Sequence, residues 1–153
     1  MRIVLPLMIF VALVAAAAYI GAQFTPGEWY ATLHRPPLAP PNWIFGPVWT
    51  VLYLCIAIAA FLMWRSPNEK RRLPATMLWC CQLTLNALWS WLFFGLERPG
   101  VALIEIMVLL VMCIATMRMF LTIRKSAGLL FLPYVVWVSF ATYLNAGFWF
   151  LNR

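Results

Sequence analysis

The chain has 153 residues, of which 65% are hydrophobic and 10% charged, and its formal net charge is +7 at pH 7. Soluble domains usually contain about 45–50% apolar and about 25% charged residues, so this composition excludes an ordinary soluble protein and predicts an integral membrane protein. The positive charge is poor support for a nucleic-acid partner, because no soluble domain is present to carry a basic stripe.

Five long apolar segments divide the chain, and each is close to the ~20 residues that cross ~30 Å of hydrocarbon. Backbone groups find no water in that layer, so these segments are expected to be helices. The sequence therefore predicts an all-α integral membrane protein, a single five-helix bundle over residues 1–153. The predicted spans are residues 3–24, 44–64, 73–96, 101–123 and 127–151.

The first span shares features with a secretory signal peptide, namely Arg2, an apolar stretch and the small residues 15–18. The apolar stretch continues to Phe24, which is long enough to cross a membrane, so we expect a retained helix. Small residues at positions 17 and 21, and at 18 and 22, also give this helix the spacing of a helix-association stripe.

Between the first two spans, residues 25–43 are rich in proline and tryptophan. Proline locks φ and removes backbone donors, so this segment is expected to be stiff and extended, with one helical turn at 28–33. Long structured loops are usually lids or binding loops, and we predict a lid over the outer end of the bundle. The alternative is a rigid spacer in which Trp29 and Trp43 anchor the membrane interface.

Within the later spans, aromatic and amide side chains recur at helical spacing, which places them on single helix faces. An unpaired amide in lipid costs several kcal/mol, so these faces are expected to point into the bundle. Glu105 is the only acid inside a span and is a candidate site residue for that reason. The three faces are Phe45, Trp49 and Tyr53; Gln82, Asn86, Trp89 and Phe93; and Pro133, Trp137, Ala141 and Asn145.

Lys and Arg are distributed unequally between the two ends of the predicted bundle. By the positive-inside rule, the richer end is cytoplasmic, which places the N-terminus inside and the C-terminus outside. A multi-pass protein of the inner membrane is the default expectation, and the outer membrane stays an alternative. The richer end carries Arg2, Arg65, Lys70, Arg71, Arg72, Arg118, Arg124 and Lys125, and the other carries Arg35, Arg98 and Arg153.

With this orientation, only Trp64 and Trp79 among the nine tryptophans lie on the cytoplasmic side. The other aromatic residues and the amides converge in the outer half, beneath the proline-rich segment. Apolar walls with a few polar groups are typical of a small-molecule site, so we predict an aromatic cavity. The alternative is that these residues hydrogen-bond one another and hold the helices together, which is favoured for Gln82, Asn86 and Glu105 taken singly.

The same residues resemble the translocator protein family, the tryptophan-rich sensory proteins related to the mitochondrial peripheral benzodiazepine receptor. The resemblance covers essentially the whole chain. It is carried by Trp29, Tyr30, Pro36, Pro37, Pro40, Pro41, Trp43, Gly46, Pro47, Trp49, Leu52, Tyr53, Asn86, Trp89, Ser90, Leu132, Pro133, Tyr134, Trp137, Phe140, Ala141, Thr142, Leu144 and Asn145.

The resemblance implies five helices, frequent homodimers and a pocket beneath the first loop that binds porphyrins, sterols and benzodiazepine-site drugs. It also implies that Trp49 and Trp137 match pocket tryptophans associated with porphyrin binding and light-dependent porphyrin breakdown. Ala141 matches a position linked to ligand and sterol response, and Glu105 stands where the family often has an acid. The proposed cholesterol motif of vertebrate members is missing, because Ala146 occupies its tyrosine position.

The expected function is therefore a membrane receptor or sensor for protoporphyrin IX and related hydrophobic ligands, with the porphyrin as a ligand and no obligatory cofactor. Two alternatives stay open: a porphyrin transporter or light-dependent degrading catalyst, and a structural or assembly protein. Conventional catalytic sets and metal-ligand spacings are absent from the sequence, which leaves Trp49 and Trp137 as the candidates for any porphyrin breakdown. The predicted binding residues are Trp29, Tyr30, His34, Trp43, Phe45, Trp49, Tyr53, Asn86, Trp89, Phe93, Glu105, Trp137, Ala141 and Asn145.

Overall fold

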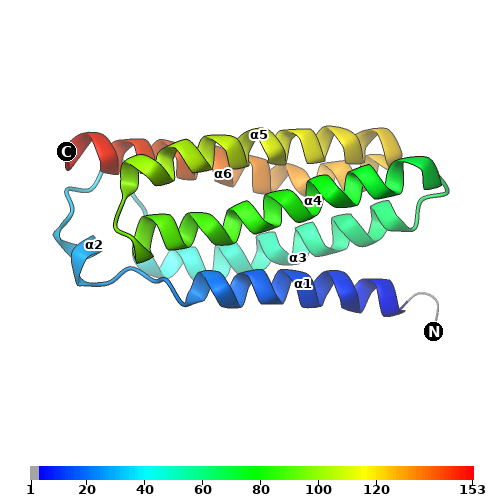
Figure 1. The fold of residues 1–153 in the computed structure, drawn as a ribbon, viewed down its shortest axis with the longest axis horizontal. Helices are drawn as coiled ribbons and strands as arrows, with labels where there is room; N and C mark the ends of the chain where they lie inside the picture. Colours follow the sequence, from blue (N-terminus) through cyan, green and yellow to red (C-terminus); the bar gives the residue numbers. More distant parts are fainter. Residues whose placement is uncertain (1–3) are drawn as a thin grey trace.

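The structure, a computed structural model, describes residues 4–153, so the predictions that concern Arg2 and Ile3 lie outside the described residues. A 3-10 turn, Asn42–Ile44, leads into the third helix, and a π-helical turn, Trp91–Gly95, continues the fourth. The helices are α1 Val4–Ala22, α2 Glu28–Thr32, α3 Phe45–Trp64, α4 Glu69–Ser90, α5 Pro99–Ile123 and α6 Lys125–Leu151 (Figure 1).

Five of these helices are long and apolar enough to cross a membrane. Between residues 4 and 153 the chain forms no β-strand, so the predicted all-α bundle of five spans is confirmed. The short helix α2 is the helical turn predicted at 28–33. The predicted bounds differ most at α4, which begins at Glu69 rather than at residue 73 because the basic residues after Glu69 are already helical.

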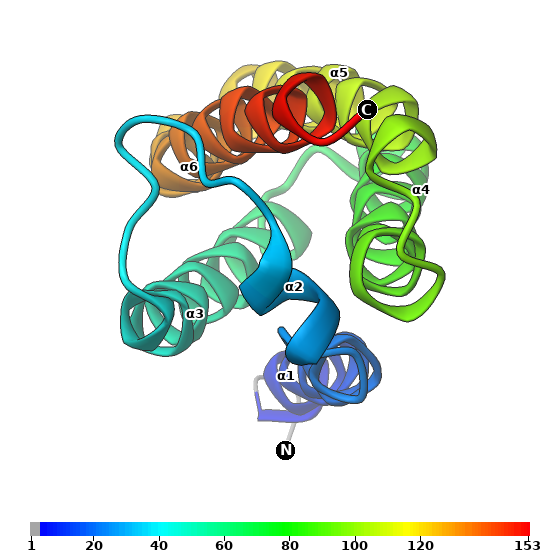
Figure 2. The same ribbon diagram turned by 90° about the vertical axis from the view of Figure 1, so that its left-hand side faces the viewer.

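The five long helices form a closed ring when the molecule is viewed along its axis (Figure 2). Each packs against two neighbours, in the order α1, α3, α6, α5, α4 and back to α1. The lid, residues 25–43, crosses one end of this ring and carries α2 over its centre. We call this the lid end.

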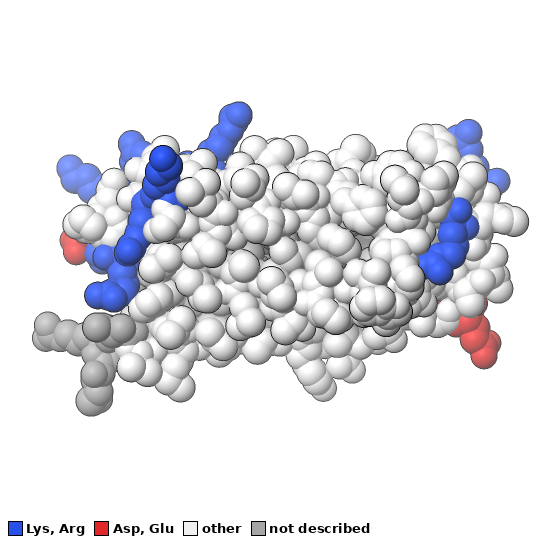
Figure 3. All heavy atoms as spheres, turned by 180° about the vertical axis from the view of Figure 1, so that it is seen from behind, with Lys and Arg blue, Asp and Glu red and all other residues white. Residues whose placement is uncertain are grey.

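The opposite end, which we call the basic end, holds most of the positive charge. On the face shown in Figure 3, Lys and Arg gather toward the two ends of the molecule, and no charged side chain is visible in the belt between them. Such a belt is what five helices long and apolar enough to cross a membrane are expected to present to lipid. The predicted separation of charge is thus present, while the assignment of the basic end to the cytoplasm stays a prediction from the positive-inside rule.

The bundle is densely packed near the basic end. Ala59, Ala60 and Ala75 are fully buried and allow the helices to approach closely. The indole of Trp79 fills the space between them, donates a hydrogen bond to the carbonyl oxygen of Ile56 at 3.1 Å, and packs edge-on against Phe10 at 5.2 Å. Alternation of small and large side chains therefore fills this half of the ring.

The tight turn between α5 and α6 yields a testable prediction. A Cβ atom added to Gly128 would lie only 2.7 Å from the backbone nitrogen of Leu121, which cannot move aside as a flexible side chain would. We expect Gly128→Ala to lower the free energy of unfolding by about 1–3 kcal/mol. The matched control is Gly46→Ala, because a Cβ atom there meets nothing within 4 Å. Thermal unfolding in detergent compares the two variants, and an equal effect would contradict this account.

Candidate functional site

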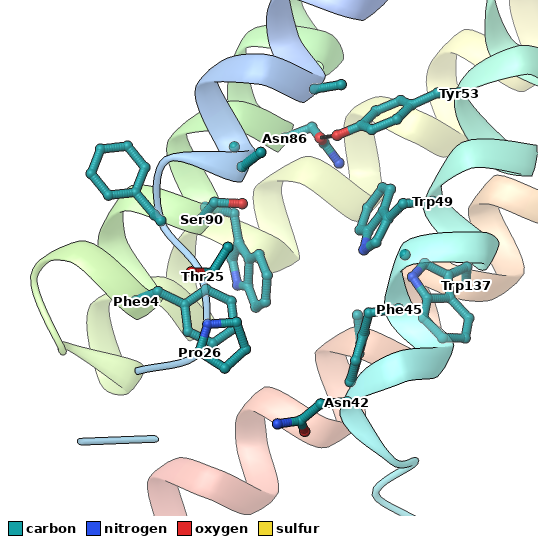
Figure 4. A pocket seen from close by; sticks show the side chains of 17 residues that line it. Thr25, Pro26, Asn42, Phe45, Trp49, Tyr53, Asn86, Ser90, Phe94 and Trp137 are labelled. Atoms are coloured by element: carbon teal, nitrogen blue, oxygen red, sulfur yellow. Dashed lines mark hydrogen bonds between the residues drawn. The ribbon is translucent and has the colours of Figure 1, made fainter. Parts of the chain in front are cut away.

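The lid half of the bundle is hollow. A cavity of about 410 Å³ lies between α1, α3, α4 and α6, beneath the two ends of the lid (Figure 4). It is lined by Ala18, Gly21, Ala22, Phe24, Thr25, Pro26, Asn42, Phe45, Gly46, Trp49, Tyr53, Asn86, Trp89, Ser90, Phe94, Trp137 and Ala141.

The face of α3 predicted from its four-residue spacing lies on the cavity. Phe45, Trp49 and Tyr53 all contribute to the wall. The ring of Trp49 lies tilted against that of Tyr53, with centroids 5.3 Å apart, and meets Tyr134 of α6 edge-on at 6.1 Å. These contacts fix the orientation of the Trp49 indole, and they leave it at the cavity surface.

Helix α6 supplies the facing part of the wall through Trp137 and Ala141. The Trp137 ring packs edge-on against Phe45 at 6.0 Å, so α3 and α6 are held together by aromatic contacts beside the cavity. The indole nitrogen of Trp137 is buried and has no hydrogen-bond partner in the described structure. Buried donors are rarely left without a partner. Because Trp137 lines the cavity, an acceptor atom on a molecule in the cavity is a candidate partner for this N–H group.

The small side chains of α1 make room for the cavity. Ala18, Gly21 and Ala22 line it, and a Cβ atom on Gly21 would come within 3.4 Å of the Ser90 hydroxyl. From the sequence, the small residues at positions 17, 18, 21 and 22 were interpreted as a surface on which another helix packs closely. The structure places Ala18, Gly21 and Ala22 along the cavity wall, where they widen the space between α1 and the opposite helices.

The deepest polar part of the site is a pair of hydrogen bonds that joins three helices. The Tyr53 hydroxyl donates to the Asn86 side-chain oxygen at 2.7 Å, and the Asn86 amide nitrogen donates to the Tyr134 hydroxyl at 3.0 Å. Asn86 lines the cavity as predicted, but its amide already holds α3, α4 and α6 together. The structural alternative for this residue is therefore observed, alongside its position on the cavity wall.

A second pair of hydrogen bonds lies closer to the lid. The Trp89 indole donates to the Asn145 side-chain oxygen at 2.9 Å, and the Asn145 amide donates to the Pro99 carbonyl oxygen at 2.7 Å. Asn145 is 1% exposed and does not line the larger cavity. The prediction that it faces the main binding space is therefore wrong, because its amide is used to join α4, α5 and α6.

The π-helical turn at the end of α4 changes which aromatic side chain reaches the cavity. Regular helical spacing predicted Phe93 on the same face as Asn86 and Trp89. The extra residue in a π turn rotates the residues that follow, so Phe94 lines the larger cavity and Phe93 is buried behind it. Phe93 stacks on Trp89 at 5.2 Å and borders a small apolar hollow of about 30 Å³, as do Tyr30 and Asn145.

The lid is fixed to α6 by specific contacts. The Asn152 side chain accepts a hydrogen bond from the His34 backbone nitrogen at 2.8 Å and donates one to the His34 carbonyl oxygen at 3.1 Å. The Tyr143 hydroxyl donates to the Pro37 carbonyl oxygen at 3.0 Å. Gly147 lets the buried ring of Pro36 approach, since a Cβ atom there would overlap the ring. The predicted lid is therefore an ordered element that is attached to α6.

The aromatic side chains of the lid pack outside the larger cavity. Trp29 meets Phe93 edge-on at 5.9 Å, and Tyr30 packs against Phe148 at 5.1 Å. Burial raises the pKa of the Tyr30 hydroxyl, and the neighbouring Arg35 guanidinium partly offsets this rise. Trp43 is 73% exposed, as the interface-anchor alternative predicts. Trp29, Tyr30, His34 and Trp43 belong to the lid, as predicted, and none of them contributes to the wall of the larger cavity, so their contact with a ligand stays a prediction.

Glu105 also lies away from the cavity. Its side chain is buried on α5, and neither carboxyl oxygen has a hydrogen-bond partner in the described structure. Residues from α1, α3, α4 and α6 line the cavity, whereas α5 contributes none. Glu105 therefore does not line this cavity, contrary to what its position in a span suggested.

Several lining residues were not predicted as binding residues. Thr25 and Asn42 flank the cavity at the two ends of the lid, and Ser90 follows Trp89 on α4. Their polar groups are ordinary loop or helix features in the sequence. The one available signal was that Ser90 directly follows a residue already assigned to an inward face.

A five-helix membrane bundle with an aromatic, ligand-sized cavity beneath an ordered lid is the architecture of a small-molecule-binding membrane protein. The profile of the TspO/MBR family matches residues 10–150, and the chain belongs to this family.

Relatives over nearly the full length agree with that assignment. The tryptophan-rich protein TspO of Archaeoglobus fulgidus is 39% identical over 97% of this chain and 98% of its own. The tryptophan-rich sensory protein of Cereibacter sphaeroides is 38% identical, over 89% of this chain and 84% of its own. The translocator protein of Bos taurus is 34% identical, over 97% and 90%.

The Asn145 bridge can be tested by its contribution to stability. Asn145→Ala would leave the Trp89 N–H group and the Pro99 carbonyl oxygen without partners in a buried site. We expect a loss of about 1–3 kcal/mol for each group left unpaired, measured as a lower unfolding temperature in detergent. Asn68→Ala is the control, because the Asn68 side chain makes no hydrogen bond in the described structure. A bridge of no structural importance would give the two variants the same unfolding temperature.

The attachment of the lid gives a separate prediction. Asn152→Ala removes both hydrogen bonds to the His34 backbone, so residues near His34 should exchange their amide hydrogens faster. Exchange in the middle of α3 should be unchanged. Hydrogen-exchange mass spectrometry in nanodiscs measures both regions. Unchanged exchange in the lid would mean that other contacts hold it.

Proposed function

We propose that this protein is a membrane receptor or sensor that binds flat hydrophobic molecules, protoporphyrin IX above all, in the cavity beneath its lid. The observation that carries the proposal is a preformed cavity of about 410 Å³ whose walls contain Trp49, Trp89 and Trp137. Membership of the TspO/MBR family supports it, as do relatives named sensory protein and translocator protein.

The walls suit a porphyrin chemically. Its macrocycle is flat and apolar, and contact with each indole would contribute about 0.5–1.5 kcal/mol beyond the burial of area. Its carboxylates need donors. The unpaired Trp137 N–H group is one, and Arg35 is another, since its guanidinium lies 3.2 Å from the Asn42 side chain at the cavity edge.

Sterols and benzodiazepine-site drugs are proposed as further ligands on the family resemblance alone. The missing tyrosine at Ala146 makes a sterol the weaker candidate. A homodimer is likewise proposed from the resemblance, and we propose that the lid end faces away from the cytoplasm because the basic end carries the larger positive charge.

Light-dependent porphyrin breakdown is the second candidate function. Trp49 and Trp137 both lie at the surface of the same cavity, where a bound and illuminated porphyrin would meet two oxidisable indoles. Loss of porphyrin absorbance under light, in wild type but not in the two tryptophan variants, would support this activity.

The binding proposal is tested by titrating protoporphyrin IX in the dark and following tryptophan fluorescence. Trp49→Phe and Trp137→Phe should each weaken binding several-fold, since the loss of one indole contact is worth about 0.5–1.5 kcal/mol. Trp64→Phe is the control, because Trp64 lies at the basic end of α3 and not on the cavity.

Saturable quenching with this pattern would support the receptor. Equal and unsaturable quenching in all four proteins would show that the porphyrin only partitions into the detergent, and the proposed function would be wrong.

A further inference from the structure

The mouth of the cavity lies between α1 and α3. Most of the residues that line the cavity are buried or half-buried, and its exposed members mark the opening. These exposed residues form two groups. One group lies at the C-terminal end of α1 and in the residues that follow it, and the other lies at the N-terminal end of α3 and in the 3-10 turn before it. The exposed lining residues are Ala22, Thr25, Pro26, Asn42 and Gly46.

This opening reaches down into the membrane-spanning part of the chain. Ala22 belongs to the apolar span Val4–Ala22, and Gly46 belongs to the apolar span Asn42–Trp64. Their exposed surfaces therefore face lipid or its headgroup boundary. Figure 4 shows the same separation, with Thr25 and Pro26 on one side of the cavity and Asn42 and Phe45 on the other.

Small residues contribute to both sides of the opening, beside Phe24 and Pro26 on one side and Asn42 and Phe45 on the other. Ala18, Gly21 and Ala22 form the α1 side, and Gly46 forms the α3 side. A Cβ atom on Gly46 would meet nothing within 4 Å, so the space beside it is empty. A side chain introduced at Gly46 would therefore extend into open space at the edge of the cavity.

The lid, in contrast, is attached on the other side of the cavity. Its hydrogen bonds from residues 34 and 37 go to Asn152 and Tyr143, at the end of α6. Lifting the lid would break these bonds, whereas passage between α1 and α3 breaks none of them. A hydrophobic molecule is concentrated in the bilayer and meets the side opening there directly.

We propose that ligands enter from the lipid layer through the gap between α1 and α3, and that Gly46 determines the size of molecule that passes. This inference rests on the proposed function, since it describes the route to the same cavity. It makes Gly46 a specificity-determining residue, although it carries no side chain to contact the ligand.

The test is stopped-flow quenching of tryptophan fluorescence by protoporphyrin IX, in the dark, with the full chain in nanodiscs. The series Gly46→Ala, Gly46→Val and Gly46→Phe should slow association progressively, by several-fold for Phe. An obstruction at the mouth slows association and dissociation by the same factor, so the equilibrium Kd should stay close to that of wild type. Gly27→Phe is the matched control, because a Cβ atom on Gly27 also meets nothing within 4 Å and Gly27 does not line the cavity.

A second variant separates this route from one through the lid. Asn152→Ala loosens the lid, so it should leave the association rate unchanged if ligands pass between α1 and α3. Faster association in Asn152→Ala, with wild-type rates in the Gly46 series, would overturn the proposal in favour of the lid. A Gly46 series that weakens Kd without slowing association would overturn it as well, because Gly46 would then be only part of the wall. Absence of saturable binding in wild type would instead refute the proposed function itself.

Discussion

An amide left unpaired in lipid costs several kcal/mol, and the shape of the lid half depends on how its two asparagines avoid this cost. Asn86 meets it by joining α3, α4 and α6 through two tyrosine hydroxyls, and Asn145 meets it by joining α4, α5 and α6. Both amides are satisfied by groups of the protein itself, so these hydrogen bonds fix the helices around the cavity. The cavity is therefore built into the bundle.

Small residues have opposite effects at the two ends of the ring. Near the basic end, buried alanines bring the helices together and the indole of Trp79 fills what remains. Near the lid end, Gly21 and Ala141 leave space, and the indoles of Trp49 and Trp137 stand at its edge. The same composition thus produces a dense half near the basic end and a half near the lid that contains the cavity.

The sequence was sufficient for the five spans, for the cavity face of α3 and for Trp137 and Ala141 on α6, because apolar length and helical spacing are local properties. Pro133, predicted on the same face of α6, is exposed. It could not show which neighbour each inward side chain meets. Asn145 was expected at the cavity but bonds to Trp89 and Pro99, and Glu105 lies on α5, which contributes nothing to the wall. The π turn places Phe94 rather than Phe93 on the cavity wall, and this turn has no sequence signature. The small residues of α1 that line the cavity have no functional group from which a binding role could be predicted.

The central claim, that the cavity is open before any ligand binds, is tested most directly by measuring a distance across it. Spin labels at Tyr19→Cys on α1 and Val136→Cys on α6 would sit on exposed positions, in a chain whose four native cysteines are replaced by alanine. Double electron–electron resonance in nanodiscs should give one narrow distance distribution, unchanged when protoporphyrin IX is added. A broad or shorter distribution that becomes narrow only with the porphyrin would show that the ligand, and not the asparagine bridges, holds the cavity open.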